Sequence, residues 1–124
     1  MNRTVAKAEA LVAEVGHPSV LHACGYPDLA AAGHFDLVVN ATSASLAGEL
    51  PPVPTSVFRA PGTAYDLVYG KDLTPFLTLA QRAGVGRLAD GVGMLVEQAA
   101  DSFAWWRGVR PPTRPVIERL SGTG

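Results

Sequence analysis

Short apolar runs that alternate with helix-like segments place the strongest limit on what this chain of 124 residues can fold into. Residues 35–40 and 64–68 are typical of strands, because each is a brief apolar run between turn residues. Residues 19–23 and 87–88 are shorter strand candidates. Strands that alternate with helices predict an α/β fold with a parallel sheet, and apolar runs of this kind are typical of strands buried on both faces.

Helical spacing of apolar residues predicts helices over 4–15, 27–32, 74–83, 90–107 and 113–121. Residues that favour helix termini flank four of these segments. The expected N-caps are Thr4, Thr74, Asp90 and Thr113, and the expected stops are Gly16, Gly84 and Gly108. The apolar side chains expected to be buried are Val5, Ala8, Val12 and Val15; Phe76, Leu79, Ala80 and Ala83; Val92, Leu95, Val96, Ala99, Phe103 and Trp106; and Val116, Ile117 and Leu120. Trp105 is also expected to pack a helix.

Composition and charge narrow the range of partners. The hydrophobic fraction of 48% rules out wholesale disorder, and a net charge of −1 gives no reason to expect nucleic acid or an anionic membrane as the main partner. Cys24 is the only cysteine, and with His17 and His22 it matches no metal-site spacing, so we expect no disulfide and no metal. No apolar run approaches the length of a membrane span, and a cytoplasmic protein is the default expectation.

The segment 41–63 consists mainly of turn and loop residues, interrupted by Val57 and Phe58, and loops of this length are often functional. Ligands of parallel sheets bind beyond the carboxyl ends of the strands, which here means residues 40–43 and 67–69. Thr42 and the Tyr69 hydroxyl are candidate ligand contacts there, and the Leu67 backbone is a candidate wall of a cofactor pocket. The alternative for the segment with Thr42 is a plain turn, and the alternative for Tyr69 is a tyrosine that simply ends a strand.

Two helix starts carry further candidate residues. Asn2, Arg3 and Thr4, with Lys7 one turn later, suit a phosphate at a helix N-terminus, although for this segment taken alone an ordinary cap with exposed cations is the simpler explanation. Gly91 and Gly93 stand in the first turn of the longest helix, where glycine is unfavourable. Close approach of a ligand or of another backbone would explain them. The Gln98 amide, a turn beyond Met94, suits a hydroxylated substrate or is simply solvated.

These motifs occur in the order and at the approximate spacing found in shikimate dehydrogenases. The strings are Asn-Arg-Thr-x-x-Lys-Ala, Phe-Asp-Leu-Val-Val-Asn-Ala-Thr-Ser, Tyr-Asp-Leu-Val-Tyr, Thr-Pro-Phe-Leu and Asp-Gly-Val-Gly-Met-Leu-Val-x-Gln-Ala-Ala. The chain therefore resembles that family over almost its whole length. The resemblance implies reversible, NADPH-dependent reduction of 3-dehydroshikimate to shikimate, a step toward chorismate and the aromatic amino acids.

The resemblance also implies roles for individual residues. Contacts to the NADP cofactor are expected from Asn2, Arg3, Thr4, Lys7, Thr42, Leu67, Gly91 and Met94. Tyr69 and Gln98 are expected to touch shikimate or 3-dehydroshikimate. Leu67 stands where many members have methionine, a conservative departure. The proton-transfer lysine and aspartate of the family belong to an amino-terminal domain that this sequence does not contain, so no catalytic residue is assigned.

The expected fold is accordingly a partial Rossmann-like, three-layer α/β domain over residues 1–124, with a parallel sheet that lacks its first two strands. Residues 90–121 are expected to form helices that would pack on the absent substrate domain. Residues 19–23 would then be a strand with an unpaired edge, separated from the next strand by the missing centre of the sheet. We expect the chain to be nearly inactive by itself. Its expected partner is a complementing amino-terminal domain or, through self-association, another copy of the chain. The alternative is a non-catalytic nucleotide-binding or protein-interaction module.

Overall fold

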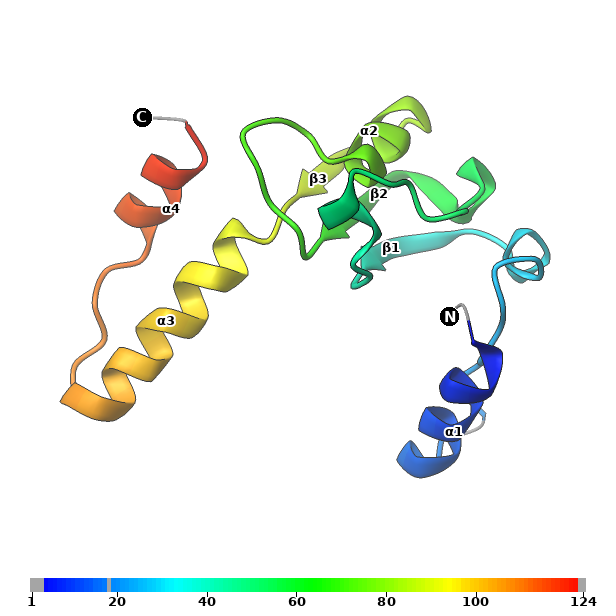
Figure 1. Cartoon of the computed structure of the whole chain (residues 1–124), viewed down its shortest axis with the longest axis horizontal. Coiled ribbons are helices and arrows are strands. Elements are labelled where there is room, and N and C mark those ends of the chain that lie inside the picture. The colour runs from blue at the N-terminus through cyan, green and yellow to red at the C-terminus, as the bar shows by residue number, and fades with distance from the viewer. Residues whose placement is uncertain (1–3, 18, 123–124) are drawn as a thin grey trace.

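The computed structural model describes residues 4–17 and 19–122 (Figure 1). Its strands are β1 (Phe35–Asn40), β2 (Phe58–Asp66) and β3 (Arg87–Ala89). Its α-helices are α1 (Val5–Val15), α2 (Pro75–Arg82), α3 (Val92–Arg107) and α4 (Arg114–Leu120). Short 3-10 helices occupy Leu29–Ala32, Ala44–Ala47 and Thr55–Val57. The predicted helices and three of the four predicted strands are therefore present, in the expected order.

The three strands form one parallel sheet in the order β1-β2-β3. The predicted α/β class with a parallel sheet is confirmed. The strand expected at 19–23 is wrong, because this segment forms a turn and irregular backbone, with Val20 71% exposed. The gap expected inside the sheet is also wrong. The strands that form are direct neighbours, and among the described residues β1 and β3 are the two edge strands of the sheet.

Strand β2 begins six residues before the predicted start at Ala64 and ends two residues before the predicted end at Val68. Pro61 and Gly62 interrupt its apolar pattern, so the pattern does not predict the first half of the strand. Pairing with β1 extends β2 back to Phe58, with a register shift beside Phe35. Gly62 fits this crowded place, because a Cβ there would lie 2.5 Å from the Arg59 carbonyl oxygen.

The core lies between one face of the sheet and helix α2. Thr74 caps α2 by accepting a hydrogen bond from the Leu77 N–H, as the Thr-Pro sequence predicts. The rings of Phe58 and Phe76 pack with their centroids 5.7 Å apart. Leu77 is buried as well, although it lies outside the predicted stripe of α2. The buried cluster consists of Leu29, Val53, Val57, Phe58, Ala64, Phe76, Leu77 and Ala80.

The opposite face of β1 is exposed. Phe35, Leu37 and Val39 are 43%, 57% and 49% exposed, and alternation along a strand places Leu37 and Val39 opposite Val38, which packs on the core. Burial of this run on both faces, as expected from its composition, is therefore wrong. Helix α1 ends at Gly16 as predicted but buries none of its residues. Thr4 occupies its N-cap position without a capping hydrogen bond from its side chain.

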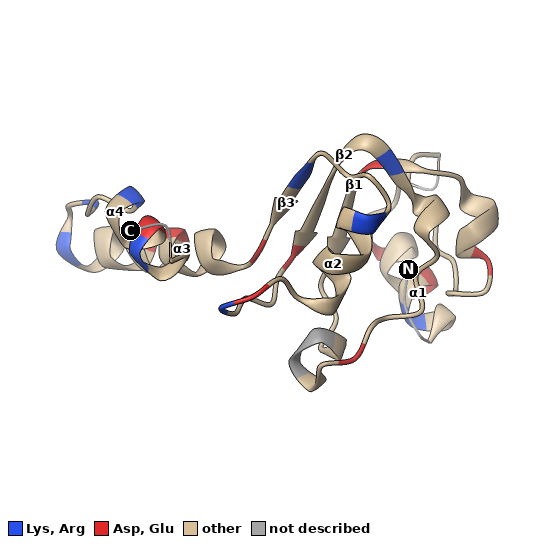
Figure 2. Cartoon of the chain, turned by 90° about the horizontal axis from the view of Figure 1, so that it is seen from above, with Lys and Arg blue, Asp and Glu red and all other residues tan. Residues whose placement is uncertain are grey.

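Helices α3 and α4 extend away from the sheet (Figures 1 and 2). Gly91 takes the N-cap position of α3, and the Asp90 carboxylate accepts a hydrogen bond from the Val92 N–H at 3.1 Å, so the capping predicted for Asp90 is shifted by one residue. Three residues of α3 are buried, Val92, Val96 and Ala100, but none of them belongs to the core cluster. Helix α3 packs against α4.

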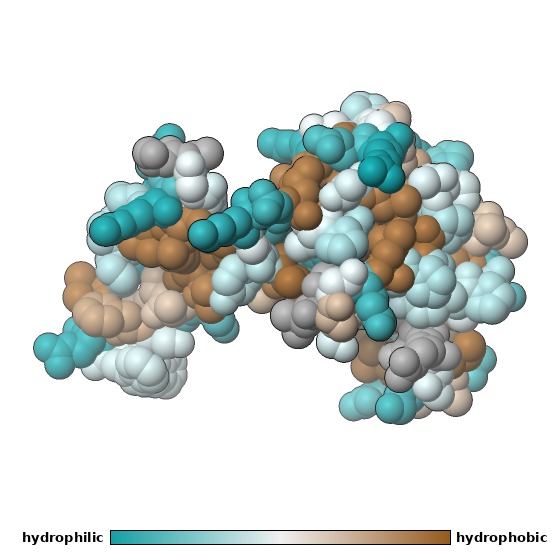
Figure 3. All heavy atoms as spheres, turned by 45° about the horizontal axis from the view of Figure 1, so that its top comes forward, coloured by the Kyte–Doolittle hydropathy of each residue, from teal (hydrophilic) through white to brown (hydrophobic). Residues whose placement is uncertain are grey.

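The far end of α3 and all of α4 lack a covering layer among the described residues. Trp105 and Trp106 are 88% and 75% exposed, so the expectation that they pack a helix is wrong. Burial of Val116 and Leu120 is wrong too, since α4 has no buried residue, and Thr113 makes no side-chain capping bond. Figure 3 shows brown, apolar atoms gathered over this lobe. The turn into α4 is held by Arg110, which pairs with Glu97 and Asp101.

No helix in the described parts of the chain is long and apolar enough to cross a membrane.

Candidate functional site

Strands β1 and β2 end side by side because Asn40 pairs with Asp66 in the sheet register. The two side chains also bond to each other: the Asn40 Nδ2 donates to Asp66 Oδ1 at 3.1 Å. Both are buried, and Asp66 has no exposed surface at all. The carboxyl edge of the sheet, where parallel folds place their ligands, therefore has a buried polar pair at its centre.

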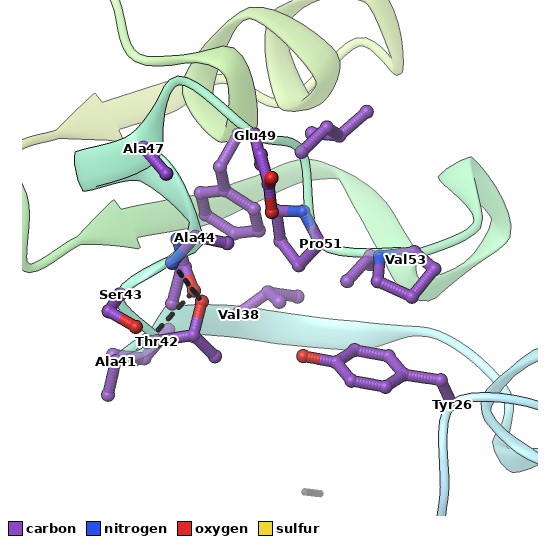
Figure 4. Close-up of a pocket in the computed structure, with 15 residues that line it drawn as sticks. Tyr26, Val38, Ala41, Thr42, Ser43, Ala44, Ala47, Glu49, Pro51 and Val53 are labelled. Carbon is purple, nitrogen blue, oxygen red and sulfur yellow. Dashed lines mark hydrogen bonds between the residues drawn. The ribbon is translucent and has the colours of Figure 1, made fainter. Parts of the chain in front are cut away.

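Thr42 is held by this pair. Its N–H and its hydroxyl donate to Asn40 Oδ1 at 3.1 Å and 2.8 Å, and the Thr42 Oγ1 accepts from the Ala44 N–H at 3.4 Å. These bonds fix the turn that follows β1. Thr42 is exposed and lines a cavity of about 690 Å³ between the end of β1 and the loop that returns to β2 (Figure 4). The predicted ligand contact at Thr42 thus has an open space beside it.

Asp66 bonds in two further directions. The Val68 N–H donates to its Oδ1 at 3.1 Å, and the Thr74 hydroxyl donates to its Oδ2 at 2.6 Å. Thr74 is the cap of α2, so one carboxylate joins the end of β1, the turn after β2 and the start of a helix. No buried side-chain nitrogen or oxygen lacks a partner in the described part of the chain.

Leu67, Tyr69 and Gly91 come together at the same edge. A Cβ at Gly91 would lie 2.0 Å from the Leu67 carbonyl oxygen and 3.3 Å from a ring carbon of Tyr69. The Gly91 N–H also donates to the Val68 carbonyl at 3.4 Å. Close approach of another backbone is therefore why Gly91 is a glycine, one of the two explanations that the sequence left open. Gly93 has no atom within 4 Å of such a Cβ, and backbone packing does not explain it.

Met94 and Gln98 follow on α3, one turn apart and on the same helix face. Both side chains are exposed. Met94 lies only three residues beyond Gly91, so the start of α3 leads from the sheet edge to these two side chains. The structure gives neither of them a hydrogen bond to the residues around Thr42 and Leu67, and their predicted roles remain predictions.

Sequence comparisons connect this edge to known enzymes. Residues 91–120 match the family model of the shikimate 5'-dehydrogenase C-terminal domain. The chain is 53% identical to the shikimate dehydrogenase (NADP(+)) of Methylococcus capsulatus and 54% identical to that of Nitrosospira multiformis, with 96% of the chain covered in each case. The chain belongs to the shikimate dehydrogenase family.

Solved structures agree with this assignment. The fold matches an Ael1 enzyme from Pseudomonas putida with a TM-score of 0.86 and 58% identity over 97% of the chain, which is 44% of that enzyme. It matches the Thermus thermophilus shikimate 5-dehydrogenase, in complex with NADP(H) and shikimate, with a TM-score of 0.76 and 33% identity over 94% of the chain and 42% of that enzyme. The chain also spans only 42% and 43% of the two curated relatives, and their sequences align with it over 119 residues.

The remaining candidate cofactor residues lie in the segment around the start of α1. Asn2 and Arg3 fall outside the described residues. Thr4 and Lys7 are exposed at the start of α1, which has no acidic residue in its first turn. In Figure 1, α1 lies apart from the carboxyl end of β1, so the structure does not bring Thr4 and Lys7 together with Thr42 and Leu67.

Two parts of this candidate site were not assigned from the sequence. The first is the buried network of Asn40, Asp66 and Thr74, for which the available signal was an aspartate inside an apolar strand. The second is the cavity wall opposite Thr42, where the Tyr26 hydroxyl points inward (Figure 4). Tyr26 and Thr42 are 16 positions apart in the sequence, so no local pattern indicates that they share a cavity. Within the described residues, no group of three or more His, Cys, Asp or Glu is arranged to hold a metal.

Proposed function

We propose that this chain forms the NADP-binding part of a shikimate dehydrogenase, and that it takes part in the reversible, NADPH-dependent reduction of 3-dehydroshikimate to shikimate when a substrate-binding part is supplied. The observation that carries the proposal is the convergence of Thr42, Leu67 and Gly91 at the carboxyl edge of a parallel sheet. The identity of 53% with a shikimate dehydrogenase (NADP(+)) over nearly the whole chain supports it.

The residues present fit a cofactor with a phosphorylated adenosine end. The start of α1 is the positive end of the helix dipole and has no acid in its first turn, and Lys7 is exposed there. Asn2 and Arg3 immediately precede it in the sequence. We assign Asn2, Arg3, Thr4 and Lys7 to the adenosine 2'-phosphate, which distinguishes NADP from NAD.

The nicotinamide half is assigned to the sheet edge. The Leu67 carbonyl lies directly against Gly91, and space is open beside Gly93 in the first turn of α3. We assign Leu67, Gly91 and Met94 to this half of the cofactor, with Thr42 beside it. When bound, NADP supplies the hydride chemistry, and the chain orients the ring.

Tyr69 and Gln98 are assigned to the substrate. The Tyr69 side chain is 50% exposed and Gln98 is exposed, so both have room for a ligand. A phenol and a primary amide can each donate to and accept from the hydroxyl groups of shikimate. We assign no proton donor to this chain. Loss of a positioned general acid costs roughly 10²–10⁴ in rate, so the chain alone is expected to turn over very slowly.

A protein-interaction role is the second candidate, and the exposed apolar surface favours it. The outer face of β1 and the lobe of α3 and α4 leave large apolar side chains exposed, Leu37 and Trp105 among them. Surfaces of this kind mark protein interaction sites. We propose that they receive the amino-terminal substrate part, and that self-association takes its place when that part is absent.

Calorimetric titration of the chain with NADP, followed by shikimate, tests the binding proposal. We expect saturable NADP binding that is lost in Arg3→Ala. The matched control is Arg82→Ala, which removes an exposed arginine on α2, away from the assigned residues. Absence of NADP binding at millimolar concentration would overturn the proposal.

Catalysis is tested by mixing the chain with a separately produced amino-terminal part of a close relative. We expect NADP-dependent oxidation of shikimate to appear only in the mixture. An amino-terminal part with its proton-transfer lysine replaced is the matched control and should give no rate. No activity at any mixing ratio, with both parts folded, would contradict the assigned reaction.

A further inference from the structure

We propose that Asp66 is a positioning residue of the cofactor site, which sets the turns carrying Thr42 and Leu67 relative to each other. The inference rests on the proposed function in one respect: that these two turns contact NADP. Asp66 itself is fully buried, so it offers no surface to a bound cofactor. Asp66 acts by positioning Thr42 and Leu67.

The first connection runs from Asp66 to Thr42 through Asn40. Asp66 Oδ1 accepts from the Asn40 amide at 3.1 Å, which leaves the Asn40 Oδ1 directed at Thr42. That oxygen accepts both the Thr42 N–H at 3.1 Å and the Thr42 hydroxyl at 2.8 Å. Because the amide of asparagine is planar, fixing its nitrogen also fixes its oxygen. Asp66 thereby determines the orientation of the Thr42 side chain at the edge of the cavity.

The second connection runs to Leu67. The same Oδ1 accepts from the Val68 N–H at 3.1 Å, and the Leu67 N–H donates to the Asn40 carbonyl at 3.0 Å. Leu67 is therefore held on both sides, and its carbonyl forms the surface against which Gly91 packs. A displacement of Leu67 would move the start of α3 and, with it, Met94.

A positioning role explains why a carboxylate is buried at position 66. A buried carboxyl group costs free energy unless it is fully hydrogen-bonded, and an apolar side chain would serve the packing of this core position as well. Buried polar networks do, however, select one arrangement of the groups they join. Asp66 Oδ2 accepts from the Thr74 hydroxyl at 2.6 Å, so the network is also anchored to α2, a rigid element of the core.

The test compares the full chain with three variants. Asp66→Ala removes the acceptor from both connections. Asp66→Asn retains one oxygen for Asn40 and Val68, and its new amide can donate to Thr74, whose hydroxyl oxygen accepts two bonds. Val57→Ala is the matched control, because Val57 is buried in the core to 1% exposure but belongs to neither connection. The readouts are the NADP dissociation constant, corrected for the folded fraction, and the backbone amide shifts of Thr42 and Leu67.

We expect Asp66→Ala to weaken NADP binding about tenfold, to move both amide shifts, and to be rescued largely by Asp66→Asn. Val57→Ala should lower stability and leave the dissociation constant within about twofold of the wild type. Equal affinities of the folded Asp66→Ala and wild-type chains would overturn the inference, as would an equal loss of affinity in Val57→Ala.

Two further outcomes, an Asp66→Ala variant that does not fold and a wild-type chain that does not bind NADP, also give a decision. If Asp66→Ala does not fold, Asn40→Ala decides, because it breaks the connection to Thr42 and leaves the bonds of Asp66 to Val68 and Thr74 in place. The same tenfold loss supports the inference, and unchanged affinity overturns it. If the wild-type chain does not bind NADP, the proposed function fails. The Thr42 and Leu67 amide shifts then still decide whether Asp66 positions the two turns.

Discussion

Gly91 stands so close to Leu67 that a methyl group at position 91 would lie 2.0 Å from the Leu67 carbonyl oxygen. The contact joins the turn after β2 to the first turn of α3, and it brings the Tyr69 ring to 3.3 Å from the same position. The position is buried, and the atom that crowds it belongs to the Leu67 backbone, so the crowding cannot be relieved by moving a flexible side chain into solvent. A backbone contact therefore decides where the longest helix leaves the sheet.

Replacing this glycine should be costly. Gly91→Ala is expected to lower the free energy of unfolding by about 2 kcal/mol or more, because the added methyl group must displace backbone atoms. Gly93→Ala is the matched control. Position 93 has open space and a helical backbone, so alanine there should raise stability by up to about 1 kcal/mol. Urea unfolding of the two variants measures both effects, and equal effects would contradict the assigned contact.

Thr74 combines two interactions, and its replacement should reveal both. Thr74→Val removes the cap on the Leu77 N–H and one of the donors to the Asp66 carboxylate. We expect a loss of about 2 kcal/mol in the free energy of unfolding. Thr74→Ser keeps the hydroxyl and should lose about 1 kcal/mol or less, for the buried methyl group. A valine variant as stable as the serine variant would show that neither hydrogen bond matters.

The outer face of β1 should promote self-association of the isolated chain. Leu37 is 57% exposed on an edge strand, and unpaired apolar edges favour pairing between molecules. Leu37→Lys is expected to shift sedimentation profiles toward the monomer and to change the free energy of unfolding by about 0.5 kcal/mol or less. Gln81→Lys adds the same charge at an exposed site of α2 and serves as the control. Equal profiles for Leu37→Lys and Gln81→Lys would mean that β1 is not the associating surface.

Trp105 should matter for assembly and not for folding. Its side chain is 88% exposed, so Trp105→Ala is expected to change the free energy of unfolding of the chain by about 0.5 kcal/mol or less. Large aromatic side chains frequently dominate interfaces, and the same variant should weaken association with the amino-terminal part at least about tenfold. Arg107→Ala, two residues away and also exposed, is the control. The association is measured by calorimetry, and an affinity unchanged by Trp105→Ala would place the interface elsewhere.

Local signals in the sequence were sufficient for much of the fold. Thr74 followed by proline predicts the start of α2, because the hydroxyl and the fixed proline dihedral act within one helical turn. The run 35–40 predicts β1, and the glycine at position 91 indicates a close approach before its partner is known. Each of these depends on residues that are neighbours in the chain. The candidate residues of the sheet edge were found in the same way, as polar groups at the ends of strands.

Tertiary structure decided what depends on contacts between distant residues. The first half of β2 forms because Phe58 pairs with Phe35, 23 positions away, in spite of an interrupting proline and glycine. The exposure of Leu37 follows from the absence of a covering layer among the described residues, which an apolar sequence cannot reveal. The network around Asp66 requires two strand ends and a helix start to meet. Hydrophobic pattern specifies that a residue prefers burial, whereas the partner that buries or bonds it is set by the path of the whole chain.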